Sequence, residues 1–211
     1  MDELRKDERL DRNQNFLLLS SARFVSLMGD RIHSMALVWY ILNKLGTGAA
    51  IGTIMILTTL PAVFLGPFTG VLADRFDRRR IMLLMDGIRA IAAVILGICV
   101  YLDVANLVLI YAVTILLSVC NALYMPTTSA LFPNLVPDEQ LYRANSITSF
   151  LTSLSTCLGP AISGLIIATF GVEGAFIVNG ASFLTSAAFE YKMVTKEQLS
   201  DHPLVVGEFF R

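Results

Sequence analysis

Apolar residues dominate six long stretches of the chain, and short polar or charged breaks separate them. The stretches cover residues 16–43, 50–73, 81–102, 105–131, 144–168 and 172–194. Each is long enough to cross the hydrocarbon core of a bilayer as a helix, which takes about 20 residues. The pattern therefore predicts an all-α membrane protein with six transmembrane helices.

The composition indicates that the bilayer is the solvent of this chain. Of its 211 residues 55% are hydrophobic and 16% are charged, and the mean hydropathy is +0.66. A soluble domain of this length cannot bury so much apolar surface. The net charge is -1, and the charges collect at predicted helix ends and tails, which leaves no basic face for nucleic acid. Three cysteines fall inside apolar stretches and predict neither a disulfide nor a metal site: Cys99, Cys120 and Cys157.

The distribution of basic residues predicts the orientation in the membrane. With the loops assigned to alternating sides, one side carries Arg5, Lys6, Arg9, Arg12, Arg75, Arg78, Arg79, Arg80, Arg143, Lys192, Lys196 and Arg211, and the other carries only Lys44. Because Lys and Arg collect in cytoplasmic loops, we expect both termini in the cytoplasm. The predicted domains are a cytoplasmic N-terminal tail at 1–15, a six-helix transmembrane domain at 16–194 and the start of a cytoplasmic linker at 195–211.

An internal repeat relates the two halves of the predicted domain. The tripeptide Leu65-Gly66-Pro67 recurs as Leu158-Gly159-Pro160, and Asp86-Gly87 recurs as Asn179-Gly180, both at an offset of 93 residues. Three helices separate the copies, so the two copies cross the membrane in opposite directions. We therefore expect two inverted three-helix repeats.

Polar side chains recur along one face of the first predicted helix. They are Arg23, Ser26, Asp30, His33 and Ser34, at spacings of i, i+3, i+4 and i+7. Such a stripe cannot face lipid, so we expect it to line a protein interface or a water-filled cavity.

Asp30 is the candidate proton carrier of this stripe. It lies about 21 Å along the helix from its entry, beyond the bilayer midplane. A carboxyl group at this depth is a functional candidate, because it can take up and release a proton. The alternative is a structural ion pair with Arg31, Arg23 or Arg89. His33 lies near the outer end of the helix and is either part of the same cavity or a hydrogen-bonded bystander.

A second pair of charges, Asp86 and Arg89, lies in the cytoplasmic third of the third predicted helix. Their i, i+3 spacing allows them to pair along their own helix. We expect this pair to lock helix packing rather than to bind substrate.

A dense basic turn joins the second and third predicted helices. It reads Gly70-Val71-Leu72-Ala73-Asp74-Arg75-Phe76-Asp77-Arg78-Arg79-Arg80. The turn resembles the signature loop Gly-x-x-x-Asp-Arg-x-Gly-Arg-Arg of major facilitator superfamily transporters, with Asp77 where the family usually has Gly. The resemblance implies a gating role, in which the loop contacts a helix of the opposite half and stabilises the state closed to the cytoplasm. The residues that match are Gly70, Asp74, Arg75, Arg78 and Arg79.

The fifth predicted helix resembles the core of the antiporter signature of the same superfamily, through Gly159, Pro160 and Gly164. Proline removes a helix hydrogen bond and glycines thin the helix surface, so we expect a bend and close packing there. Ordinary packing of small residues is the alternative. One feature departs from the drug/proton antiporters, which often carry an arginine in helix four: there is none between Asp103 and Arg143.

The loop before the fifth predicted helix indicates a branch of the superfamily. It reads Phe132-Pro133-Asn134-Leu135-Val136-Pro137-Asp138-Glu139-Gln140-Leu141, and Ala144-Asn145-Ser146 follows. It resembles the corresponding loop of the macrolide-efflux and siderophore-exporter branch. Members of the superfamily have two six-helix halves, so the resemblance covers the N-terminal half.

These features predict a secondary-active exporter of amphipathic, drug-like small molecules that is coupled to protons, in a bacterial plasma membrane. Its partners would be the lipid bilayer, the small-molecule substrate, and a second six-helix half absent from this chain or another copy of it. The sequence has no Walker loop and no hydrolase or zinc-protease motif, so we expect no enzyme, no catalytic residue and no cofactor. The alternative is a fragment without transport activity, at most an assembly partner.

Overall fold

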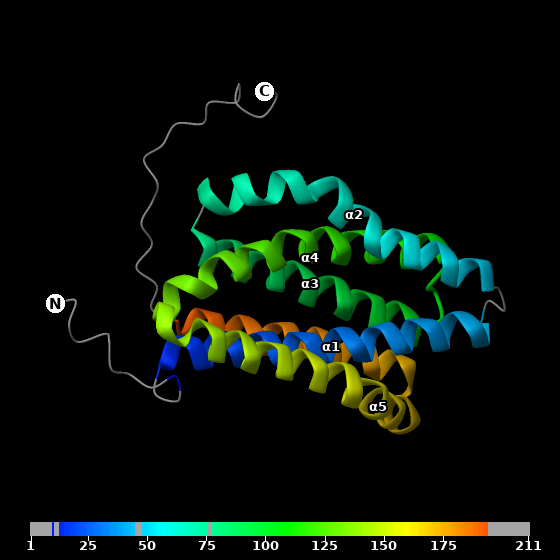
Figure 1. Ribbon diagram of the computed structural model, residues 1–211. Coiled ribbons are helices and arrows are strands. Elements are labelled where there is room, and N and C mark those ends of the chain that lie inside the picture. Colours follow the sequence, from blue (N-terminus) through cyan, green and yellow to red (C-terminus); the bar gives the residue numbers. More distant parts are fainter. Residues whose placement is uncertain (1–9, 11–12, 45–47, 76, 194–211) are drawn as a thin grey trace.

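Helices make up almost all of the described chain (Figure 1). The computed structural model describes residue 10 and residues 13–44, 48–75 and 77–193, with the side chains of 67–75 left out. This part of the chain contains no strand, so the prediction of an all-α protein is confirmed. The helices are α1 (Gln14–Lys44), α2 (Gly48–Arg75), α3 (Arg78–Tyr101), α4 (Leu107–Leu135), the short 3-10 helix η3 (Asp138–Gln140) and α5 (Leu141–Tyr191). The predicted tail and linker lie almost entirely outside the described residues.

The longest helix, α5, consists of two stretches. It has 51 residues, more than twice the length of about 20 that one membrane crossing takes. Its backbone leaves helical geometry at Gly171, where φ is 73° and ψ is 178°. The chain reverses there, so that the stretch 141–170, yellow to gold in Figure 1, and the stretch 172–191, orange, run in opposite directions. The apolar windows predicted at 144–168 and 172–194 fall on these two stretches.

Four helical segments are long and apolar enough to cross a membrane. They are Gly48–Gly66, Arg78–Tyr101, Leu107–Leu135 and Asp138–Tyr191, the last including both stretches of α5. We attribute the absence of α1 from this set to Arg23, Asp30 and Arg31, which interrupt its apolar surface. The described residues thus form a membrane protein, whereas six spanning helices in two inverted repeats stay a prediction.

The helices pack in a definite order. α1 lies along α5, α3 lies against both α4 and α5, and α2 packs along α4 with little contact to α1 or α3. α1 contacts both stretches of α5: Gly29 lies against Ser182 of the second stretch, and Gly159 of the first stretch lies against Arg31. Large apolar side chains such as Phe64 remain exposed on the outside, as expected of a surface that faces lipid.

Two large apolar clusters fill the described interior, one toward each end of the bundle, and a small third cluster of Ala90, Ala93 and Phe183 lies beside Arg89. Ile41 and Phe176 belong to the first, and Phe16 belongs to the second, which lies at the end with the basic turn. Along α3, Asp86 and Arg89 fall between the residues of the two clusters. The buried charges therefore occupy a polar layer between two apolar ones.

Candidate functional site

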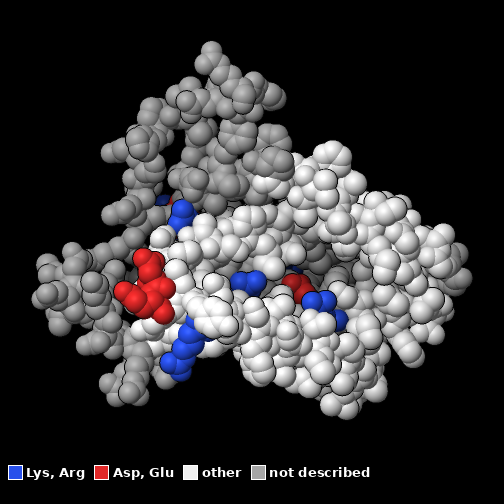
Figure 2. All heavy atoms as spheres, in the orientation of Figure 1, with Lys and Arg blue, Asp and Glu red and all other residues white. Residues whose placement is uncertain are grey.

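The polar stripe of α1 divides between the interior and a partly exposed face. Ser26 and His33 are buried, whereas Arg23, Asp30 and Arg31 keep part of their surface exposed. The face seen in Figure 2 is largely uncharged, and a short row of basic and acidic side chains lies in a hollow over α1, near its middle. The stripe thus leaves charge on a partly exposed face of α1.

Asp30 forms none of the ion pairs considered for it from the sequence within the described part of the chain. Its neighbour Arg31 instead donates a hydrogen bond of 3.1 Å from Nη2 to Oγ1 of Thr156 in α5. The charges of Arg89 and Asp86 in α3 still act on the carboxyl group of Asp30. Asp30 is therefore electrostatically linked to the buried pair without being tied to a single cation.

His33 lies inside a helix interface rather than on the exposed face. Its ring packs edge-to-face on Phe176 of α5, with 5.0 Å between the ring centroids. Among the described residues its Nδ1 atom has no hydrogen-bond partner. The structure therefore places His33 in the packing between α1 and α5.

The second predicted pair, Asp86 and Arg89, forms a buried ion pair on α3. Both residues are almost completely inaccessible to solvent. The guanidinium carbon of Arg89 lies 4.3 Å from the ring centroid of Tyr124 in α4 and 4.5 Å from that of Phe183 in α5. Aromatic faces attract cations, so Arg89 holds three helices together at this layer.

Glu190 belongs to the same layer, although it is not among the residues predicted from the sequence. It lies in the last turn of α5, is fully buried, and accepts a hydrogen bond of 2.8 Å from the hydroxyl group of Tyr124. The sequence does carry a signal for Glu190. Asn179, Phe183, Ser186 and Glu190 follow the 4-3-4 spacing of one helix face, and all four are buried. An acid on such a face of a membrane helix is a functional candidate.

The basic turn holds the ends of two helices. Arg78 donates from Nη1 to the carbonyl oxygen of Ala130 near the end of α4, at 3.0 Å. Arg79 donates from Nε to the carbonyl oxygen of Glu190 at 3.0 Å and from Nη2 to that of Tyr191. The last carbonyl groups of a helix lack partners in the helix and attract cations. These contacts lie within the chain, and the predicted contact to an opposite half stays a prediction.

Three residues of the gating motif lie in α2, where the backbone is helical but side chains are outside the described set: Gly70, Asp74 and Arg75. Asp77, the departure from the family pattern, has a clear structural role. It is the N-cap of α3, and its carboxylate accepts a hydrogen bond of 3.0 Å from the backbone N–H of Arg80. Its φ of -53° needs no glycine. An acid at this position therefore stabilises the start of α3.

The glycine and proline residues of the fifth predicted helix have different surroundings. Gly159 is buried and its Cα faces Arg31, whereas the position of a Cβ on Gly164 meets nothing within 4 Å. Backbone dihedrals stay helical at Pro160, and within α5 the departure lies at Gly171. Close packing is thus concentrated at Gly159, and a bend at Pro160 stays a prediction.

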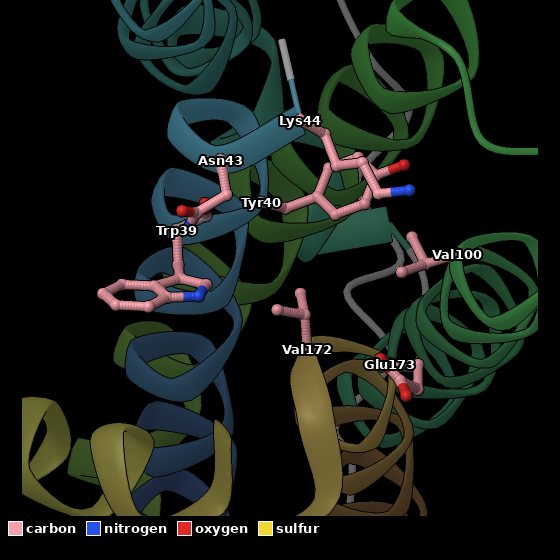
Figure 3. Close-up of a pocket in the computed structure, with 7 residues that line it drawn as sticks. All are labelled: Trp39, Tyr40, Asn43, Lys44, Val100, Val172 and Glu173. Atoms are coloured by element: carbon pink, nitrogen blue, oxygen red, sulfur yellow. The ribbon is translucent and has the colours of Figure 1, made fainter. Parts of the chain in front are cut away.

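A small cavity lies where α1, α3 and α5 meet, at the end opposite the basic turn (Figure 3). Its volume of about 200 Å³ is below the ~300 Å³ at which sites for drug-sized ligands begin. Beside it, Nζ of Lys44 lies 2.6 Å from the carboxylate of Asp103, and this hydrogen bond raises the pKa of Lys44. We regard this cavity as too small for a drug-like substrate. Its lining residues are Trp39, Tyr40, Asn43, Lys44, Val100, Val172 and Glu173.

Comparison with known proteins places the chain in a family. Residues 11–207 match the family model described as transmembrane secretion effector, of the major facilitator superfamily. The chain belongs to this family. Because its members are membrane transporters, the prediction of a protein that is not an enzyme is consistent with it.

Among the described residues, no group of three His, Cys, Asp or Glu side chains is placed to hold a metal ion.

Individual relatives point to the predicted branch. The chain is 32% identical over 183 residues to the uncharacterized MFS-type transporter YfiS of Bacillus subtilis, covering 86% of this chain and 43% of that protein. It is 29% identical to macrolide efflux protein A of Streptococcus pyogenes, covering 78% of this chain and 40% of that protein. It is 24% identical to the staphyloferrin A transporter of Staphylococcus aureus, over 77% of this chain and 41% of that protein.

The resemblance to the macrolide-efflux and siderophore-exporter branch is therefore confirmed. The chain spans less than half the length of each of these three relatives.

Proposed function

We propose that the chain is one half of a secondary-active exporter of amphipathic small molecules that is coupled to protons. The observation that carries this proposal is the set of partly exposed charges on α1, Arg23, Asp30 and Arg31. Charged side chains are costly within a membrane and mark substrate or ion pathways. In a family of membrane transporters, this stripe is the best candidate for the lining of such a pathway.

The substrate class follows from the relatives and from the shape of the protein. One relative is named for macrolide efflux and another for staphyloferrin A transport. The cavity near Lys44 is too small for ligands of that size. The substrate would therefore bind on the face of α1 that carries Asp30, between this chain and a second six-helix unit.

The packing order supports the inverted repeat and the membrane topology that we propose for this half. The repeat would exchange α1 with α4, and α2 with the first stretch of α5. Under this exchange, the contact of α1 with α5 corresponds to the contact of α4 with α2. Both contacts are extensive in the structure. With six crossings, both termini would lie on the side of the basic turn, which we place in the cytoplasm.

The complete transporter, which carries both halves, provides the test. Reconstituted in liposomes, it should move a fluorescent amphipathic substrate uphill when a proton gradient is imposed. Asp30→Asn should abolish the pH dependence of this flux while leaving membrane insertion intact. Asp103→Asn is the matched control, because Asp103 is exposed at the other end of the bundle and pairs with Lys44.

Wild-type pH dependence in the Asp30→Asn protein would move the coupling role elsewhere, with Asp86 next in line. The 211-residue chain alone should not transport, since alternating access requires two units that rock about a shared site. Uphill flux by the purified monomer would refute this part of the proposal.

A further inference from the structure

Glu190 is a buried carboxyl group without a cation. It is fully inaccessible to solvent, and no described Lys, Arg or His lies within ion-pair distance of its carboxyl oxygens. Its Oε1 atom accepts the hydrogen bond from the neutral hydroxyl group of Tyr124, and its Oε2 atom has no partner in the described structure. A buried, unpaired carboxylate costs several kcal/mol, whereas a protonated acid is neutral.

Charged and titratable groups of two other helices act on Glu190: Asp86 and Arg89 of α3, and Tyr124 of α4. Cys120 of α4 and Asp30 of α1 act in turn on Asp86 and Arg89, and Arg23 of α1 lies near Tyr124. Ser186 of its own helix lies beside the carboxyl groups of both Glu190 and Asp86, although its hydroxyl group has no hydrogen-bond partner within the described part of the chain. Among the described residues, Arg79 donates to the backbone carbonyl oxygens of Glu190 and Tyr191 and lies over the ring of Tyr191, and it forms no ion pair with the carboxyl group of Glu190.

The innermost part of this layer has two carboxyl groups and one guanidinium group. Arg89 is engaged by Asp86, and among the described residues the Oδ2 atom of Asp86 has no hydrogen-bond partner, nor does Oε2 of Glu190. Tyr124 stands between the two acids, with its ring under the guanidinium group and its hydroxyl group on Glu190. One positive charge cannot neutralise both carboxylates.

We propose that Asp86, Arg89, Tyr124 and Glu190 form a proton-binding site in which one guanidinium group and one proton neutralise two carboxyl groups. In the structure described, Arg89 neutralises Asp86 and the proton is held on Oε2 of Glu190. Release breaks only this O–H bond, the electron pair stays on the carboxylate, and the proton passes to water. Arg89 is then shared by two negative groups. Asp30 is not a member of this site: it lies on the partly exposed face of α1 and acts on the site only through its charge interaction with Asp86 and Arg89.

The position of the site connects proton binding to the basic turn. The same residue that holds the proton offers its backbone carbonyl to Arg79. A shift of the last turn of α5 on loss of the proton would therefore move Arg79 as well. This role in transport rests on the proposed function, whereas proton binding itself does not.

Infrared spectroscopy of the 211-residue chain in lipid nanodiscs tests the site, because a protonated carboxylic acid has a C=O stretching band that a carboxylate lacks. The wild-type protein should show such a band at neutral pH, and Glu190→Gln should lose it. Glu139→Gln is the matched control, since Glu139 is exposed in η3. Asp30→Asn should retain the band. A band that survives in folded Glu190→Gln, or that is missing from the wild type, overturns the proposal.

Two further variants separate this site from a merely structural contact. Tyr124→Phe removes the hydrogen bond to the C=O oxygen of Glu190, so the band should move to higher frequency. An unchanged frequency would contradict the proposal even where Glu190→Gln fails to fold. Asp86→Asn releases Arg89 to pair with Glu190, and the band should disappear although Glu190 is still present; a band of full intensity would refute the shared charge.

The spectra need no transport measurement. A Glu190 band in a transporter whose flux ignores the proton gradient would refute the proposed coupling and support this site. Proton-coupled flux without a Glu190 band would support the proposed coupling and refute this site.

Discussion

Gly29 of α1 lies directly against Ser182 in the second stretch of α5. A Cβ atom at Gly29 would stand 1.9 Å from the Oγ atom of Ser182 and 2.5 Å from Oδ1 of Asn179. The absence of a side chain therefore lets two helices approach at the depth of Asp30, one residue further along α1. Small residues at helix contacts are a common means of close packing in membranes, where water supplies no hydrophobic force between helices.

Gly29→Ala should lower the stability of the folded protein. Overpacking of this kind costs ~1–3 kcal/mol, although part of it is relieved if Ser182 changes rotamer. Gly87→Ala in α3 is the control, because a Cβ there meets nothing within 4 Å and alanine gains up to about 1 kcal/mol of helix propensity. Thermal unfolding in detergent should give a lower Tm for Gly29→Ala only. Equal melting temperatures would show that α1 and α5 are less closely packed than described.

Gly171→Ala should destabilise the reversal between the two stretches of α5. The φ of 73° and ψ of 178° lie in a region that is essentially restricted to glycine, and a residue forced into it costs ~1–3 kcal/mol. A Cβ would also lie 2.6 Å from the carboxylate of Glu173. Gly164→Ala serves as the control in the same helix, with open space around it. The Tm of Gly171→Ala should fall while that of Gly164→Ala stays or rises.

Asp77→Ala should cost about 1 kcal/mol, because it removes the N-cap of α3. Asp77→Asn keeps an oxygen that accepts from the backbone N–H of Arg80 and should retain most of the stability. Asp77→Gly, which restores the usual family residue, should cost only a few tenths of a kcal/mol. The free energies of unfolding of the three variants provide the measurement. A loss in Asp77→Asn as large as that in Asp77→Ala would mean that charge, not capping, is what α3 requires.

The helices were predictable because the bilayer imposes a simple rule on the sequence. Every spanning segment must be long and apolar, so the breaks at 44–49 and 102–105 are visible as interruptions of an apolar pattern. The same rule makes the packing of the helices against one another difficult to predict from the sequence. Where both faces of a helix are apolar, the sequence does not show which small residues lie at a contact: a Cβ at Gly29 would clash with α5, whereas a Cβ at Gly52 would meet nothing within 4 Å.

The candidate site was predictable only where its partners are close in sequence. Asp86 and Arg89 pair at i, i+3, and this spacing is readable. The helix face that Glu190 shares with Asn179 is readable from the spacing, but its hydrogen bond to Tyr124, 66 positions away in another helix, is not. The family resemblance predicts a contact between the turn that carries Arg79 and an opposite half, which stays a prediction, and it gives no sign of the contacts of Arg79 to Glu190 and Tyr191, more than 100 positions along its own chain. Long-range pairing of this kind requires the fold.

Arg79→Ala should loosen the end of α5 and lower stability by about 2 kcal/mol, the range for hydrogen bonds to charged groups. The last carbonyl groups of the helix would lose their partner, so backbone amides of residues 186–191 should exchange hydrogen faster. Arg80→Ala is the matched control. Its side chain is 86% exposed and pairs, within the described part of the chain, with Asp77, and such surface pairs contribute ~1 kcal/mol or less.

The stability of Arg79→Lys should fall between those of Arg79→Ala and Arg80→Ala. An ammonium group lacks the planar fork with which the guanidinium group reaches both carbonyl oxygens. Unchanged exchange at the end of α5 in Arg79→Ala, with Arg80→Ala indistinguishable from it, would show that the basic turn does not hold this helix.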